Sequence, residues 1–95
     1  MIKCDSLEEV RKQIDRIDEE IVKLIAERGK YVMQVVSFKN EEEGVRVPAR
    51  EAAVIQKVRN RAEEYGADPD MMEALYREMI ARFVDLEIEE LRRKT

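Results

Sequence analysis

The sequence SLEEVRKQIDRIDEEIVKLIAERGKYVMQVVSFKN, residues 6–40, decides the fold of this chain. Stepping through it alternately by three and four residues selects an almost wholly apolar series, which is the spacing of one helix face. The series is Leu7, Val10, Ile14, Ile17, Ile21, Leu24, Arg28, Tyr31, Val35 and Phe38. Ser6 and Glu9 have the spacing of a capping box at its start. We therefore predict one helix over residues 6–40, about 50 Å long at 1.5 Å per residue.

The composition predicts a single all-α domain covering residues 1–95. The chain is 44% hydrophobic and 42% charged with three Gly and two Pro, a balance typical of helices rather than of sheets or disorder. A second helix is predicted from Pro48 to Tyr65, ended by Gly66, with Ile55, Val58, Ala62 and Tyr65 facing inward. Asp68 has the position of a cap for a third helix, which is predicted from Pro69 to about Arg92. A chain of this size buries little of the long helix by itself, so a helical partner is implied.

Several function classes are disfavoured by the same composition. A net charge of −4 argues against a nucleic-acid partner, which needs excess Lys and Arg. The absence of a signal peptide and of a long apolar run predicts a soluble, cytoplasmic protein with no membrane partner. The chain has no histidine, a lone Cys4 and scattered carboxylates, so we expect no metal and no cofactor. An enzyme of this composition would work by binding and electrostatics.

Two charged residues interrupt apolar helix faces, and a charge buried there needs a partner or a ligand. Arg28 interrupts the first helix and Glu87 the third, so the two are either a mutual salt bridge or ligand contacts. The expected inward series of the third helix is Met72, Tyr76, Ile80, Phe83, Glu87 and Leu91. Lys39 follows Arg28 by eleven residues, which on a continuous helix puts both cations on one face, able to hold one small anion.

Arg11 stands seventeen residues before Arg28, about 25 Å along the helix, too far to share a site with it. A second copy changes this, because antiparallel pairing about a two-fold axis near residues 19 and 20 sets Arg11 of one chain opposite Arg28 of the other. Two identical shared sites follow. Arg50 and Glu51 could close each site. The alternative is that these residues bind no ligand. Arg11 and Arg50 would then be ordinary surface cations, and Lys39 would complement the helix dipole.

Four segments together resemble the all-helical chorismate mutases over nearly the whole chain. They are VRKQIDRID at residues 10–18, LIAER at 24–28, Phe38-Lys39, and PARE at 48–51. The resemblance implies an intertwined homodimer of three-helix chains in which each active site takes one arginine from the partner. It also implies conversion of chorismate to prephenate in aromatic amino-acid biosynthesis, with a small dicarboxylate as substrate.

The resemblance further implies roles for the charged residues. Arg11 of the partner and Arg28 would hold the two substrate carboxylates. Lys39 would bind the ether oxygen of the enolpyruvyl group and a carboxylate. Glu87 falls where many members have a glutamine that donates to the same oxygen, and a glutamate donates only when protonated. Arg28, Lys39 and Glu87 are therefore the expected catalytic residues.

The pocket wall departs from the family pattern. Arg50 would support this wall and Glu51 would meet the ring hydroxyl, whereas Val47 and Phe83 stand where many members have polar residues. Val47 and the segment Tyr31-Val32 are similar to the related isochorismate-pyruvate lyases of salicylate formation, which remain the alternative activity.

Two interpretations without catalysis remain open besides the interpretation as an enzyme. One is a helical dimer that binds an aromatic metabolite, and the other is a plain coiled-coil dimer in which Arg28 sets the register. A dicarboxylate should raise the melting temperature of the first but not of the second.

Overall fold

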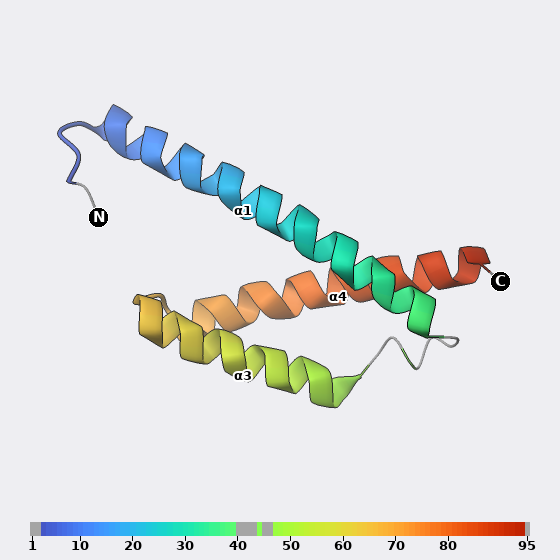
Figure 1. The fold of residues 1–95 in the computed structure, drawn as a ribbon. Coiled ribbons are helices and arrows are strands. Elements are labelled where there is room, and N and C mark those ends of the chain that lie inside the picture. The colour runs from blue at the N-terminus through green and yellow to red at the C-terminus, as the bar shows by residue number, and fades with distance from the viewer. Residues whose placement is uncertain (1–2, 40–43, 45–46, 95) are drawn as a thin grey trace. The chain divides into compact units, whose positions relative to one another are not determined.

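The computed structural model describes residues 3–39, 44 and 47–94, and within them it contains helices and no strand. In chain order these are α1 (Leu7–Val35), the 3-10 helix η1 (Val36–Phe38), α3 (Pro48–Tyr65) and α4 (Pro69–Lys94), as Figure 1 shows. The chain divides into two compact units, Met1–Tyr31 and Val32–Thr95. The prediction of an all-α fold with a long first helix is confirmed.

α1 begins as predicted and ends earlier. The Glu9 N–H donates to Ser6 Oγ at 3.2 Å, while the Asp5 N–H donates to the Glu9 carboxylate at 2.8 Å. The prediction of one helix to residue 40 is wrong, because a 3-10 turn follows Val35 and Lys39 is extended at φ −121°. Neighbouring β-branched valines at 35 and 36 lower helix propensity, and helices often tighten into such a turn at their ends. The three-turn spacing expected between Arg28 and Lys39 therefore does not hold.

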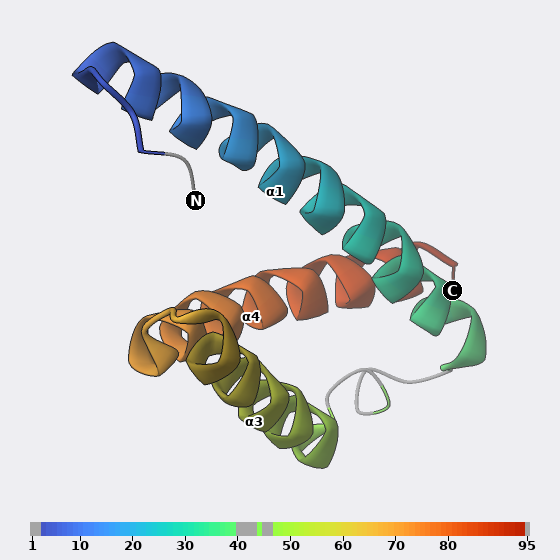
Figure 2. The ribbon, with the colours of Figure 1, turned by 60° about the vertical axis from the view of Figure 1, so that its left-hand side comes forward.

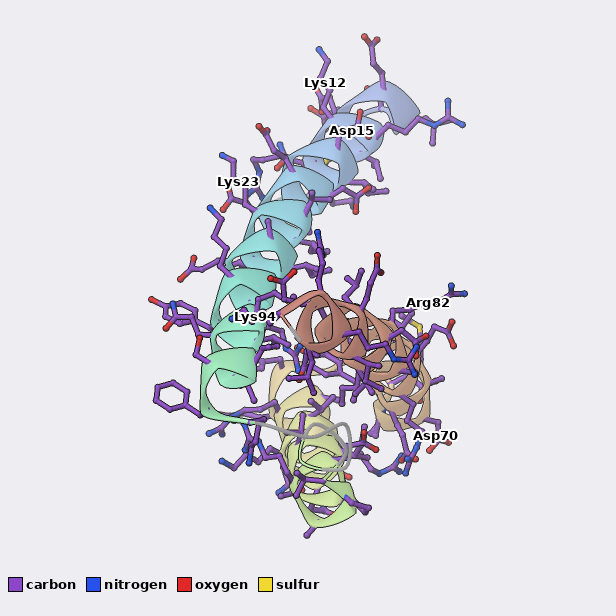
Figure 3. All side chains as sticks on the ribbon, turned by 90° about the vertical axis from the view of Figure 1, so that its right-hand side faces the viewer. Lys12, Asp15, Lys23, Asp70, Arg82 and Lys94 are labelled. Carbon is purple, nitrogen blue, oxygen red and sulfur yellow. The ribbon has the colours of Figure 1, made fainter. Side chains whose placement is uncertain are left out.

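The apolar face of α1 is exposed in the single chain, and α1 contains no buried residue. Its first six apolar positions keep 39–63% of their surface in solvent, namely Leu7, Val10, Ile14, Ile17, Ile21 and Leu24. Lys12 and Lys23 make ion pairs within α1, to Glu8 and Glu19 respectively, at 3.9 Å. Figure 3 shows both lysines extending away from the helix. α1 therefore has one charged face and one apolar face that its own chain leaves uncovered.

α3 and α4 form an antiparallel hairpin whose start and stop signals act as predicted. Pro48 occupies the first turn of α3, and Gly66 ends the helix in the left-handed conformation at φ 78°, which glycine adopts at little cost. Asp68 Oδ1 then accepts the N–H groups of Asp70 at 2.9 Å and Met71 at 3.4 Å. From this turn the two helices diverge toward their other ends, as Figures 1 and 2 show.

The hydrophobic core of the second unit joins η1 to α4. It consists of Val36, Val84, Ile88 and Leu91, with Met33 and Ile80 packed against it. Of the residues expected inward on α3, Ile55 and Ala62 are buried, but Tyr65 is 79% exposed. Tyr65 is the last residue of α3, where the chain already turns into Gly66.

An ion-pair network ties the closed end of the hairpin together. Arg59 of α3 contacts Asp70 at 3.0 Å and Glu73 at 2.9 Å, and Glu73 also accepts from Arg77 Nε at 2.7 Å. The hydrogen bond from Arg77, followed by that from Arg59, holds the pKa of the Glu73 carboxyl below its ordinary value. Hydrogen bonds to Asp70 and Glu73 raise the pKa of Arg59. The network fixes α3 against α4 near their turn.

Candidate functional site

The two arginines of the first unit stand far apart on one helix. Arg11 is exposed and Arg28 is half-buried. Both lie within α1, so the rise of the helix separates them by about 25 Å. An anion the size of a small dicarboxylate cannot touch both of them in one chain.

Lys39 lies directly after η1 in extended backbone. Its N–H donates to the Val36 carbonyl at 3.3 Å, and its side chain is half-buried. A Cβ added to Gly44 would lie 3.3 Å from Lys39 Cδ, closer than such atoms usually approach. Glycine at position 44 therefore leaves room for the aliphatic part of the Lys39 side chain.

Glu87 is buried on α4, with only 6% of its surface exposed. Val84, Ile88 and Leu91 of the core surround it in sequence on the same helix. Burying a carboxyl group is costly unless it is hydrogen-bonded, and within the described part of the chain no buried side-chain nitrogen or oxygen lacks a partner. Phe83, one turn earlier on α4, is half-buried. Glu87 is thus a buried charged residue on the helix that carries the apolar core, and the sequence predicted it to face inward.

An open hollow of about 360 Å³ lies between the start of α3 and the middle of α4. The residues that line it are Val47, Pro48, Glu51, Ala81, Val84 and Asp85. Glu51 is half-buried, whereas Arg50 beside it is exposed. The structure therefore brings two of the expected wall residues, Val47 and Glu51, to one hollow.

A second, smaller hollow of about 80 Å³ adjoins the first. Glu51 and Ala81 line both hollows, and Ile55, Arg77 and Ile80 complete the smaller one. The two spaces consequently meet at Glu51 and Ala81.

Several α4 residues that line these hollows were not predicted from the sequence. Val84 is buried and follows Ile80 by one turn, so the helical spacing that gave Ile80 could also have found it. Ala81, Asp85 and Arg77 gave no such signal, because none belongs to an apolar series. Their position depends on how α3 crosses α4, which the pattern of a single helix does not contain.

The described residues contain neither a cluster of metal ligands nor a helix that could span a membrane. No group of three or more His, Cys, Asp or Glu side chains is placed to hold a metal ion. No described helix combines the length and apolar character needed to cross a bilayer.

Comparison with known proteins places this arrangement in a family. The family model for chorismate mutase type II matches residues 10–88. An isochorismate pyruvate lyase of Pseudomonas aeruginosa is 35% identical over 81 residues, which cover 85% of this chain and 80% of that protein. A chorismate mutase of Methanocaldococcus jannaschii is 36% identical over 69 residues, 70% of this chain and 69% of that protein.

A third relative is a much longer protein. The bifunctional chorismate mutase/prephenate dehydratase of Aquifex aeolicus is 37% identical over 87 residues, which cover 87% of this chain but 24% of that enzyme. The region matched by the family model contains every residue that the sequence analysis assigned to the site, from Arg11 to Glu87. The family model covers most of the chain, which belongs to the chorismate mutase type II family.

Proposed function

We propose that this chain converts chorismate to prephenate as a homodimer with two shared active sites. The observation that carries the proposal is the family match over residues 10–88, which includes all eight expected site residues. They are Arg11, Arg28, Lys39, Val47, Arg50, Glu51, Phe83 and Glu87.

The chemistry suits a protein without histidine. The rearrangement of chorismate is a pericyclic reaction of one molecule, so it needs no nucleophile and no proton transfer. The protein would hold the flexible enolpyruvyl arm over the ring, which removes much of the entropic part of the barrier. Arg28 and the partner's Arg11 would bind the two carboxylates and so fix both ends of the reacting system.

Electrostatic stabilisation would come from Lys39 and Glu87. As the ether bond breaks, negative charge grows on its oxygen, and donors placed there beforehand lower the barrier. The Lys39 ammonium is one such donor. Glu87 would be the other in its protonated form, since only a carboxylic acid has an O–H to give. The burial of Glu87 supports a role in which water does not compete for that hydrogen bond.

The exposed face of α1 supports the homodimer. A two-fold axis near residues 19 and 20 pairs Arg11 with Arg28 of the other chain, and the same register sets Ile14 opposite Ile25 and Ile17 opposite Val22. All four of these apolar side chains are exposed in the single chain. This register therefore brings exposed apolar side chains of the two chains together and also sets the two arginines opposite each other.

A second candidate is cleavage of isochorismate to salicylate and pyruvate. The Pseudomonas aeruginosa relative is named for that activity, and the match covers 80% of its length. Val47 lines the larger hollow. Together with Phe83 it would make the wall of the proposed site more apolar, which favours a substrate whose ring hydroxyl does not face that wall.

One assay separates the candidates. The purified protein is given chorismate and isochorismate in turn, and prephenate, salicylate and pyruvate are measured. We expect prephenate from chorismate as the faster reaction. Faster release of pyruvate from isochorismate would replace the first proposal by the second. Absence of turnover with both substrates would contradict both, and a dicarboxylate-dependent rise in melting temperature would then indicate a binding dimer.

A further inference from the structure

A chain of alternating charges runs from α3 to α4 and back to α3. It starts at Arg59, passes through Glu73 to Arg77 by contacts of 2.9 and 2.7 Å, and reaches the small hollow that Arg77 shares with Glu51. Resting on the proposed function, and on the contact with the ring hydroxyl that the family resemblance implies for Glu51, we propose that Arg77 is a positioning residue for the active site. It orients the Glu51 carboxylate through water held in this hollow.

The Arg77 guanidinium is held by a carboxylate that the other helix holds in turn. Its Nε donates to Glu73 Oε2 at 2.7 Å, and Glu73 is in turn held by Arg59 from the other helix. A guanidinium has five N–H groups in a rigid plane, so this bond leaves those of both terminal nitrogens available. Although the Arg77 side chain is 59% exposed, this ion pair holds its guanidinium group, a hydrogen-bond donor, at the wall of the hollow.

The hollow has the size and polarity to hold water. Its volume of about 80 Å³ exceeds the roughly 10–15 Å³ of such space that one water molecule needs. Arg77 supplies donors on the α4 side and Glu51 supplies acceptors on the α3 side, while Ile55, Ile80 and Ala81 form the rest of the lining. A bridging water is nearly as favourable in enthalpy as a direct hydrogen bond.

The consequence concerns substrate binding. Glu51 lines both hollows, so its carboxylate can accept from water on one side while it meets the ring hydroxyl on the other. A carboxylate already held in one orientation loses less conformational entropy when the ligand binds. Loss of Arg77 should therefore raise KM more than it lowers kcat, because the hydroxyl contact exists in both ground and transition states.

α4 offers a matched control. Arg82 donates from Nε to Glu78 at 2.9 Å with the same four-residue spacing as Arg77 and Glu73. The Arg82 side chain is 77% exposed and projects away from the helix, as Figure 3 shows. Replacement of either arginine by glutamine removes the same kind of ion pair, but only Arg77 lines the hollow that Glu51 also lines.

The test is a double-mutant cycle on chorismate turnover, with thermal unfolding measured on every variant. We expect Arg77→Gln to raise KM by about threefold to tenfold, in the usual range for coupled neighbours, with kcat changed less than about twofold. Arg82→Gln should leave KM unchanged, and Arg77→Lys should restore part of the loss. In a Glu51→Gln background, Arg77→Gln should have no further effect on KM.

Three results would overturn the inference, and they are distinguishable. Equal KM values for Arg77→Gln and Arg82→Gln would remove Arg77 while leaving the proposed role of Glu51 intact. The same would follow if Arg77→Gln raised KM equally in the Glu51→Gln background. An unchanged KM in Glu51→Gln itself would remove Glu51 from the proposed site, and the inference with it.

Discussion

α1 and the α3–α4 hairpin differ in how much of their apolar surface the single chain buries. The hairpin packs against η1 around Val36, Val84, Ile88 and Leu91 and is tied at its turn by the ion pairs of Arg59 and Glu73. α1 has a more regular apolar face than either helix of the hairpin, yet it buries none of its residues in the single chain. A regular pattern thus indicates that a face will be covered, and it does not say by which chain.

The largest effect should come from placing a charge in the exposed apolar face of α1. Ile17→Asp places a charge next to the proposed two-fold axis, so we expect a monomer with no measurable chorismate turnover, because each site then lacks its second arginine. Light scattering after size-exclusion chromatography measures the mass. Lys23→Asp introduces the same residue on the charged side of α1 and should leave the dimer intact. A dimeric, active Ile17→Asp variant would contradict the proposed pairing.

Mixing two inactive variants tests whether the sites are shared. Arg11→Ala and Arg28→Ala should each lower kcat/KM by about a hundredfold, corresponding to about 3 kcal/mol of lost ion contact. A heterodimer of the two variants contains one site with both arginines and one with neither. An equal mixture, after subunit exchange, should therefore recover about a quarter of wild-type activity by random pairing. No recovery in a mixture shown to exchange would mean that both arginines of a site come from one chain.

The third effect concerns the buried carboxyl of the hairpin. Turnover should fall as the pH rises, because a deprotonated Glu87 has no O–H to donate to the ether oxygen. Glu87→Gln keeps a donor at every pH and should lose this dependence, with activity within about tenfold of wild type at the acidic end. Exposed Glu89→Gln should keep the wild-type profile. An unchanged profile in Glu87→Gln would exclude the proposed donor.

The smallest effect should come from the ion pairs at the turn. The pKa of Glu73 is lower in the folded chain than its ordinary value of 4.5, so its contribution to stability is present above that value. The contribution is lost as the pH falls through the lowered pKa. Glu73→Gln should therefore lower the melting temperature near neutral pH, and the difference from wild type should shrink in acid. Exposed Glu78→Gln, on the same helix, should change the melting temperature less.

The sequence was most informative where local chemistry sets the backbone. Pro48, Gly66 and Asp68 gave the bounds of α3 and the start of α4, because each acts through its own backbone or cap. The early end of α1 was missed, since the apolar spacing continues through Val35 and Phe38 although the helix does not. Tyr65 was wrongly predicted to face inward for a related reason. Its place in the apolar series does not show that α3 ends at this residue and turns into Gly66.

The site was only partly predictable from the sequence. Arg28 and Glu87 stood out because charges rarely interrupt an apolar series, and Arg11 followed from the length of the helix. Arg77 and Asp85 could not be found in this way. Their relation to Glu51 depends on the crossing of two helices, and their residue types are common on any helix surface.

The exposed isoleucines and leucines of α1 affect how enzyme activity in a cell would depend on the amount of this chain. If a second copy covers them, every newly synthesised chain is catalytically silent until it meets another. At low abundance the output should then rise more steeply than in proportion to the number of chains made. In this range, halving expression would lower the flux by more than half, and dilution alone would inactivate the enzyme.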